Sequence, residues 1–397
     1  MLKNKDRLWN RNYLKLLATN FLLFFSFMLL APLLPLYLSE TFNADKDAIG
    51  LVLSGYTVVA LIARLFSGYL VDTFPRKLVL LVAFMIFSLF FVGYIAAGTL
   101  LLFTIVRTLH GAPFGVATVA TSTAAIDVLP LSRRAEGIGY YGLSNNVATA
   151  ISPTAALLIY GLWHSYDSLF LLAFILSLIG FFVIVSVDIP KRTAAKHYIP
   201  ISVKRFILLK GWSQGLTIIC FSFAYGVVST YIAIYGKEEF GITHGTGLFF
   251  ALFALGLILS RITGGRSLRK GRIVRNATEG MLVSLCGYIV FASLHNLWGY
   301  YGAALIIGLG NGHMYPAFQN MFINLASNNQ RGTANSTLLV SWDLGIGIGI
   351  LAGGFLSHNF GFHPAFWIAC AVNALGVAFY FLYSRANYLR NKRTPTM

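Results

Sequence analysis

The chain has 397 residues, of which 57% are hydrophobic and 11% are charged, and its formal net charge is +17 at pH 7. Soluble domains carry about 25% charged residues, so this composition excludes an ordinary soluble protein. Apolar segments recur along the whole sequence and leave no polar stretch long enough for a soluble domain of useful size. We therefore expect an all-α polytopic membrane protein.

The apolar segments come close to the ~20 residues that an α-helix needs to span a bilayer. In chain order, the twelve predicted transmembrane helices cover residues 13–38, 47–71, 77–98, 101–126, 137–161, 167–187, 207–234, 245–265, 277–295, 298–325, 333–357 and 363–384. The first segment lacks a small-residue cleavage site, so we expect it to be retained rather than removed as a signal peptide. Cys220, Cys286 and Cys370 lie inside apolar segments without metal or redox spacing, and we expect neither a metal nor a cofactor.

The basic residues are distributed unevenly between the two sides of the predicted membrane protein. With a cytoplasmic N-terminus, most of the 30 Lys and Arg residues lie in the two tails and in the connections on the cytoplasmic side. The opposite side keeps only Lys46 and Lys237. This asymmetry predicts that both termini are cytoplasmic, and it favours contacts with anionic membrane lipids over nucleic acid. The short loops are typical of a protein of the bacterial cytoplasmic (inner) membrane.

An internal repeat relates the two halves of the chain. Arg64-Leu65-Phe66-Ser67-Gly68 matches Arg261-Ile262-Thr263-Gly264-Gly265 at a shift of 197 positions, and the same shift relates Gly115 to Gly312 and Arg134 to Arg331. A constant shift near half the chain length indicates two homologous halves. We predict an N-terminal six-helix bundle over 1–187, a cytoplasmic linker over 188–206 and a C-terminal six-helix bundle over 207–397.

The connection after the second segment carries the sharpest motif. Gly68-Tyr69-Leu70-Val71-Asp72-Thr73-Phe74-Pro75-Arg76-Lys77 resembles the G-x-x-x-D-R-x-G-R-K loop of the major facilitator superfamily, although Thr73 and Pro75 depart from it. With twelve segments in two parallel halves, the resemblance covers essentially the whole chain. It implies twelve transmembrane helices in two six-helix bundles, and a monomeric secondary transporter of small molecules rather than an enzyme.

The resemblance implies that this loop is part of a cytoplasmic gate. Gly68 would allow close helix approach, and Asp72 would pair with cations or cap a neighbouring helix N-terminus. Its candidate partners lie after the fourth segment. The predicted gate residues are Gly68, Asp72, Arg76, Lys77, Arg133, Arg134 and Glu136. The alternative is that Arg76 and Lys77 only anchor the topology.

The fourth segment contains Val106-Arg107-Thr108-Leu109-His110-Gly111, which resembles the R-x-x-Q-G pattern of proton-coupled members, with His110 in place of glutamine. A cation in hydrocarbon is costly, so Arg107 needs a carboxylate, carbonyl groups or water as partners. Arg107 and His110 are therefore candidates for guiding a proton. In the alternative interpretation, Arg107 bonds to a helix carbonyl and His110 is a packing residue.

The eleventh segment carries Asp343 about ten residues from its start, which is ~15 Å along a helix and close to the middle of the bilayer. The other twelve acidic residues can be placed in loops or near helix ends. Burial favours the protonated form of a carboxyl group, and a nearby cation favours the ionised form. We predict that Asp343 is a proton-binding switch; the alternative is a permanently protonated or hydrogen-bonded packing residue.

Polar side chains in other segments predict a water-accessible substrate cavity. Asn311, Tyr315 and Gln319 share one helix face at i, i+4 and i+8. The candidate cavity residues are Asn20, Asn145, Asn146, Gln214, Tyr225, Asn311, His313, Tyr315 and Gln319. The alternative for each is a hydrogen bond between helices.

The function that this pattern favours is proton-coupled efflux of a small organic or amphipathic compound, with the proton gradient as energy source. The export direction comes from the resemblance around Asp72 and Arg107, whereas Ser152-Pro153 and the few glycines of the fifth segment weaken a drug/proton antiporter assignment. The alternative is a proton symporter that imports a sugar, organic acid or other nutrient. No spacing of nucleophiles, metal ligands or paired acids supports a membrane enzyme, and two homologous halves suit gated occlusion better than a channel.

Overall fold

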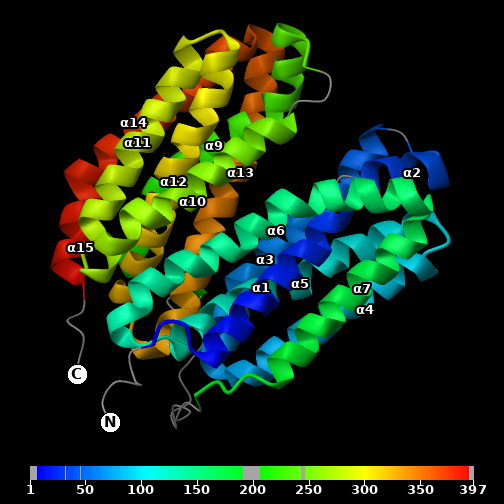
Figure 1. Cartoon of the computed structure of the whole chain (residues 1–397), viewed down its shortest axis with the longest axis horizontal. Helices are drawn as coiled ribbons and strands as arrows, with labels where there is room; N and C mark the ends of the chain where they lie inside the picture. The colour runs from blue at the N-terminus through cyan, green and yellow to red at the C-terminus, as the bar shows by residue number, and fades with distance from the viewer. Residues whose placement is uncertain (1–6, 32, 45, 191–205, 243–245, 393–397) are drawn as a thin grey trace. The chain divides into compact units, whose positions relative to one another are not determined.

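The structure is a computed structural model that describes residues 7–31, 33–44, 46–190, 206–242 and 246–392 (Figure 1). These described residues form helices and short connections, and no β-strand occurs among them. Contacts divide the chain into two compact units. The first contains Met1–Gly137, Tyr141–Ile207 and Asn329–Ser336, and the second contains Ile138–Tyr140, Leu208–Asn328 and Thr337–Met397. The predicted linker falls largely outside the described residues.

The helices of the first unit follow the predicted segments closely. They are α1 (Arg11–Leu30), α2 (Leu34–Phe42), α3 (Lys46–Thr73), α4 (Arg76–Ala96), α5 (Leu100–Val128), α6 (Arg134–Trp163) and α7 (Tyr166–Val185). The single helix expected over 13–38 is instead divided into α1 and α2. Pro35 lies in the first turn of α2, where its missing N–H costs nothing, so it favours a new helix start over continuation of α1.

Close approach of α3 and α5 builds the centre of the first unit. Gly115 on α5 faces α3 so closely that an added Cβ would lie 2.6 Å from the carbonyl oxygen of Ala60. In the second unit Gly312, which the shift of 197 relates to Gly115, lies equally close to Ser260. Glycine at both positions therefore permits equivalent helix pairs in the two units, as expected for two copies of one module.

The second unit contains the helices α9 (Trp212–Phe240), α10 (Thr246–Arg269), α11 (Ile273–Ser293), α12 (Leu297–Leu325), α13 (Arg331–Phe360), α14 (Phe362–Phe379) and α15 (Arg385–Asn391), with a π-turn over Tyr380–Ser384 between the last two. Its core includes Tyr235, Phe291, Tyr300 and Phe366. The first residues of α13 are an exception, because Arg331–Ser336 belong to the first unit by their contacts.

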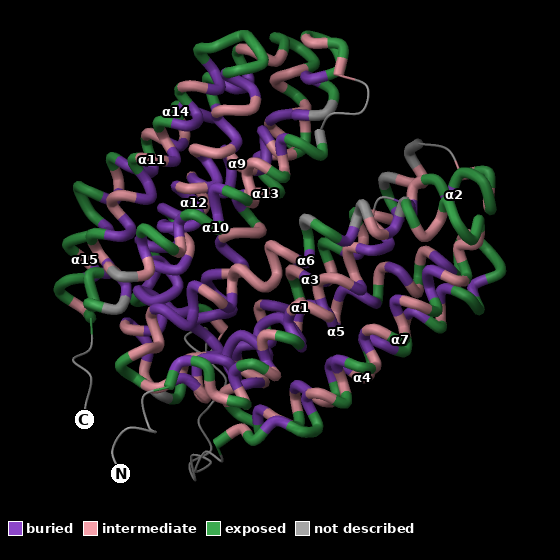
Figure 2. Tube along the Cα trace, viewed as in Figure 1, coloured by how far each residue is buried: buried purple, intermediate pink, exposed green. Residues whose placement is uncertain are grey.

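Apolar surface covers the helices of both units. Buried and exposed positions alternate along them (Figure 2), and exposed positions include Leu101, Leu351 and Leu382, which are 72%, 77% and 81% exposed. Nine described segments are long and apolar enough to cross a membrane: Arg11–Phe42, Leu51–Thr73, Arg76–Ala96, Leu100–Val128, Tyr166–Val185, Leu209–Ile232, Gly247–Gly265, Arg331–Phe360 and Phe362–Asn391. Helices α6, α11 and α12 are not among these nine segments, and each of them contains several glycine and polar residues. The chain is an integral, multi-pass membrane protein.

Candidate functional site

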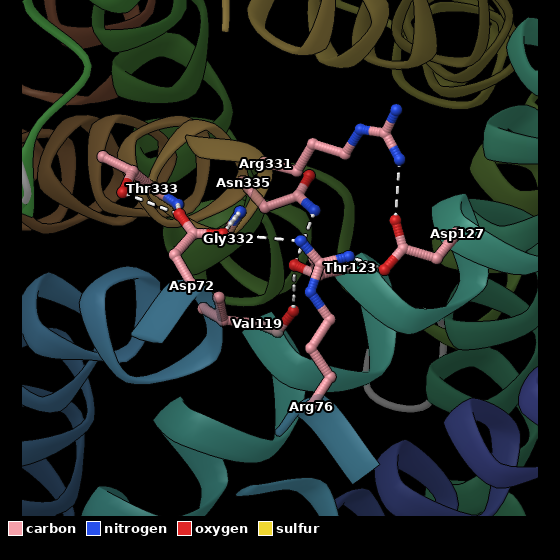
Figure 3. Close-up of polar contacts among 9 residues, drawn as sticks. All are labelled: Asp72, Arg76, Val119, Thr123, Asp127, Arg331, Gly332, Thr333 and Asn335. Carbon is pink, nitrogen blue, oxygen red and sulfur yellow. Dashed lines mark hydrogen bonds and ion pairs between the residues drawn. The ribbon is translucent and has the colours of Figure 1, made fainter. Parts of the chain in front are cut away.

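The carboxylate of Asp72, at the end of α3, holds the start of α13 within the first unit (Figure 3). Its Oδ1 accepts from the backbone N–H of Gly332 at 3.0 Å, and its Oδ2 accepts from the N–H and the hydroxyl of Thr333 at 2.9 and 3.0 Å. A helix N-terminus leaves backbone N–H groups without partners and attracts negative charge. Asp72 therefore caps the N-terminus of α13. Capping a neighbouring helix was one of the two roles expected for it, and pairing with a cation was the other.

Gly68, one turn before Asp72, explains why the two helices can approach this closely. A Cβ added at Gly68 would lie 2.7 Å from Cα and 2.9 Å from N of Thr333, which is closer than real Cβ atoms come. Any larger residue would push the start of α13 away from Asp72. The glycine of the motif thus has a packing role that follows directly from the geometry.

Two arginines and a second aspartate extend the site. Arg76, the first residue of α4, lies 3.5 Å from Oδ1 of Asp72 and pairs with Oδ2 of Asp127, at the end of α5. Oδ1 of Asp127 accepts from Arg331 at 2.8 Å. The side chains of Asp72, Arg76, Asp127 and Arg331 are only 7%, 6%, 11% and 16% exposed, so each charge depends on the others for compensation.

Hydroxyl and amide groups complete the contact around the start of α13. Asn335 donates to the hydroxyl of Thr123 at 3.0 Å, and Thr123 donates to the carbonyl of Val119 at 2.8 Å (Figure 3). The Ser336 hydroxyl donates to the carbonyl oxygen of Arg64. The first turns of α13 are thus bonded directly to α3 and α5, and Arg76 on α4 pairs with the same two aspartates. We name this set of contacts, from Arg331 to Ser336, the α13 clasp.

The other predicted gate residues have different partners. Lys77 donates to the carbonyl of Val185, at the C-terminus of α7. Arg133 and Glu136 pair with each other at 2.7 Å, and Arg134 donates to the carbonyl of Ile126 at 3.3 Å. Burial, and to a lesser extent the charge of Arg331, lower the pKa of Arg134 to about 10, so it remains a cation at neutral pH. Asp72 contacts Arg76 and the start of α13, and its expected pairing with the residues after the fourth segment stays a prediction.

Asp127, Arg331 and Thr333 were not predicted as site residues. The repeat did single out Arg331, as the counterpart of Arg134, but gave it no role. In the sequence, Asp127 is recognisable only as a polar residue at the end of an apolar segment. Its importance depends on cations more than 50 and 200 positions away in the chain, which no local pattern reveals.

Removing the carboxylate of Asp127 tests how strongly this cluster is coupled. We expect Asp127→Ala to destabilise the protein by about 3 kcal/mol, because Arg76 and Arg331 would lose a partly buried counter-charge. Glu279→Ala is the matched control: it breaks the exposed pair with Arg275 and should cost at most ~0.5 kcal/mol. Thermal unfolding of the purified variants measures both. Equal stability of the two variants would contradict the proposed coupling.

Arg107 and His110 are joined through Tyr94 in the first unit. The phenol oxygen accepts from Nη1 of Arg107 at 3.0 Å and lies 2.6 Å from Nδ1 of His110. The guanidinium lies over the rings of Tyr56 and Phe27, 4.2 and 5.2 Å from their centroids. Arg107 is thus stabilised by a hydroxyl group and aromatic faces, partners that the sequence did not predict.

Some polar atoms around Arg107 and His110 could form further hydrogen bonds. Nε of Arg107, Nε2 of His110 and the hydroxyl of Tyr56 are buried and have no hydrogen-bond partner among the described residues. Buried polar groups of this kind usually bond to water or to a ligand. The prediction that Arg107 and His110 guide a proton is compatible with the chain Arg107–Tyr94–His110, and it stays a prediction.

Asp343 lies in the second unit on α13, twelve residues after the helix begins, and is half-buried. The neighbouring Trp342 contacts the rings of Tyr225 on α9 and Tyr315 on α12, at centroid distances of 5.9 and 5.2 Å. Two of the predicted cavity residues therefore meet the helix that carries Asp343. Gly345 and Gly349 pack against the α9 backbone, which agrees with the expected close-packing face.

Several predicted cavity residues form hydrogen bonds between helices. Asn20 donates to Ser144 and accepts from Tyr141, both at 2.8 Å. Gln214 donates to the carbonyl of Ser384. Both residues are fully buried, so the geometry favours the alternative that they join helices.

Helix α12 carries two more bonded residues. Asn311 accepts from Ser284, and His313 uses both ring nitrogens, with Thr263 at 2.8 Å and Asn276 at 3.1 Å. Gln319 is buried, 6% exposed, whereas Asn145 and Asn146 on α6 are half-buried. Among the described residues, no group of three or more His, Cys, Asp or Glu side chains is placed to hold a metal.

Long apolar helices with charged and polar groups between them define an all-α polytopic membrane protein. The family model described as Major Facilitator Superfamily matches residues 16–336 and 277–396, so the chain belongs to the major facilitator superfamily. It is therefore a transporter of small-molecule substrates and not an enzyme.

Relatives and a solved structure agree with this membership. The chain is 24% identical over 343 residues to the staphylopine export protein of Staphylococcus aureus (strain Mu50 / ATCC 700699), covering 81% of this chain and 83% of that protein. It is 27% identical over 325 residues to the class G tetracycline resistance protein of Vibrio anguillarum, covering 78% and 81%. The crystal structure of the human organic anion transporter MFSD10 (TETRAN) matches with a TM-score of 0.79 at 15% identity, over 93% of this chain and 98% of that one, which shows a shared fold.

Proposed function

We propose that the protein exports a small organic or amphipathic compound from the cytoplasm in exchange for protons, by alternating access. The observation that carries the proposal is Asp343, an acid in the interior of the candidate membrane-spanning helix α13, one residue after Trp342, whose ring contacts Tyr225 and Tyr315. The name of one relative, an export protein, supports the outward direction. The proposed location is a bacterial cytoplasmic membrane, with both termini in the cytoplasm.

In this scheme Asp343 binds a proton from outside and loses it to the cytoplasm when substrate binds. A carboxylate that becomes neutral changes the local charge by one unit, which alters its affinity for water and for polar substrate groups. The rings of Trp342, Tyr225 and Tyr315, which meet at the same level of α13, offer flat faces of the kind that bind apolar or planar compounds. Substrate and proton would therefore compete for one region of the second unit.

The α13 clasp provides a conformational element for the cycle. Asp72 binds the first residues of α13, while the remainder of this helix, including Asp343, belongs to the second unit. We infer that the clasp releases and reforms once in each cycle, so that it contributes free energy to only one of the two alternating states. A contact present in both states would not affect their balance.

Direction of coupling is tested with purified protein in proteoliposomes. A compound library, with tetracycline as the first probe, is screened for thermal stabilisation of the protein at two pH values. Vesicles are then preloaded with a stabilising compound and diluted into a more acidic medium. An antiporter should lose the compound faster than in vesicles without a gradient. Accumulation of external compound under the same inward proton gradient would establish a symporter instead.

A further inference from the structure

A basic pocket lies at one end of the second unit and includes the exposed Arg275–Glu279 pair. It has a volume of about 550 Å³ and is formed by the turn between α10 and α11, the first turns of α11, and α15. Four cations line it, Arg272, Arg275, Arg385 and Lys392, with one acid, Glu279. Glu279 accepts from Arg275 at 2.6 Å, so three cations have no partner assigned within the lining.

The first half of the chain has a different charge pattern at the equivalent turn. The shift of 197 places Arg269 where the first half has Asp72, so the α10–α11 turn lacks the carboxylate that caps α13 in the first unit. The N-terminus of α11 has no side-chain cap and no acidic residue in its first turn. Glu279 compensates only Arg275, so net positive charge remains at this turn, which favours an anionic ligand.

The wall formed by α15 is held in place. Asn387 donates to the hydroxyl of Ser213 at 2.6 Å, and Tyr388 accepts from Asn324 on α12 at 3.0 Å. Just before α15, the Ser384 hydroxyl donates to the carbonyl of Ser213 at 2.8 Å. The cations of α15 and α11 therefore converge on a preformed pocket, and binding would not require this helix to be ordered first.

The position of the pocket relative to the membrane indicates the source of its ligand. Arg272 and Arg275 precede the segment 277–295 that hydropathy predicts to cross the membrane, and Lys392 directly follows the candidate span Phe362–Asn391. Residues at the ends of spans meet the lipid headgroups, so we place the pocket at that level. Leu375 on α14 and Leu382 in the π-turn that follows it are 65% and 81% exposed, and they offer an apolar surface to acyl chains.

We propose that this pocket binds the phosphate headgroup of an anionic glycerophospholipid, whose acyl chains lie along the exposed face of α14. The guanidinium groups of Arg272 and Arg385 bind phosphate oxygens, and Lys392 adds a mobile third charge. Such a site would tie the end of the second unit to anionic regions of the membrane.

Native mass spectrometry of the full-length protein tests this site with an equal mixture of phosphatidylglycerol and phosphatidylcholine. The triple variant Arg272→Gln, Arg385→Gln, Lys392→Gln leaves the Arg275–Glu279 pair intact. We expect its retention of phosphatidylglycerol to fall by about fivefold per cation removed. The triple variant Arg11→Gln, Lys210→Gln, Arg390→Gln is the matched control: it removes the same charge from exposed positions outside the pocket and should retain the lipid.

A second variant separates loss of binding from loss of structure. Arg272→Lys, Arg385→Lys with Lys392→Arg keeps the charge of the pocket, so phosphatidylglycerol should still be retained. The proposal is overturned if the glutamine variant retains the lipid like the wild type, or if both glutamine variants lose it equally. It is also overturned if inorganic phosphate displaces phosphatidylglycerol at equal concentration, because the site would then bind a free anion.

Discussion

Replacement of Asp343 by asparagine is expected to abolish gradient-driven transport and to spare exchange of substrate across the membrane. Asparagine keeps the size and the hydrogen-bonding capacity of the side chain but does not titrate. If one proton moves per substrate molecule, a gradient of one pH unit should sustain about a tenfold concentration ratio in the wild type. The variant should sustain none, as measured by tracer flux in proteoliposomes.

Two further variants make this result specific. Ser341→Ala removes a hydroxyl that bonds within α13, to the carbonyl of Thr337, and should leave concentrative transport intact. Asp343→Glu keeps a titratable group and should restore part of it. Concentrative transport by Asp343→Asn at the wild-type level would show that another residue carries the proton.

Replacement of Asp72 by asparagine is expected to release the start of α13. The carboxylate accepts three hydrogen bonds there, and hydrogen bonds to a charged group contribute about 1.5–3 kcal/mol. Loss of the charge should therefore raise the open population of the clasp by roughly 10- to 100-fold. Gly68→Val should act in the same direction, because its side chain would meet the backbone of Thr333.

Cysteine accessibility measures this release. Ser336→Cys places a thiol at a fully buried position of the clasp, in a protein whose Cys220, Cys286 and Cys370 have been replaced by serine. A membrane-impermeant maleimide should label it at least several times faster when Asp72→Asn is present. Glu279→Gln, far from the clasp in sequence and in the second unit, is the control and should leave the rate unchanged. Identical rates in all three proteins would refute the clasp.

The sequence predicted the helices well because membrane spans depend on local composition. The segment expected over 101–126 is α5, Leu100–Val128, whose N-cap Thr99 accepts from the N–H of Leu102. The segment expected over 298–325 begins at Leu297, after the N-cap Asn296. The break between α1 and α2 was missed, because hydropathy continues through it and only proline geometry marks it.

The candidate site was harder to predict. The motif identified Gly68, Asp72 and Arg76, but the residues of α13 that Gly68 and Asp72 contact lie about 260 positions later in the chain. Residues Arg331–Ser336 belong to the first unit by their contacts. Neither the periodicity nor the composition of the sequence predicts this. For Arg107, the cost of a buried cation predicted that the side chain has stabilising partners. It could not identify them, because aromatic faces as well as polar groups can stabilise a cation.

Infrared difference spectroscopy of the carboxyl groups tests the central claim most directly. Spectra are recorded with and without a stabilising compound across a pH series, for the wild type and for Asp343→Asn. The account predicts a protonated-carboxyl band that disappears when the compound binds and that is missing in the variant. A wild-type spectrum in which this band stays unchanged at every pH, with or without the compound, would contradict it.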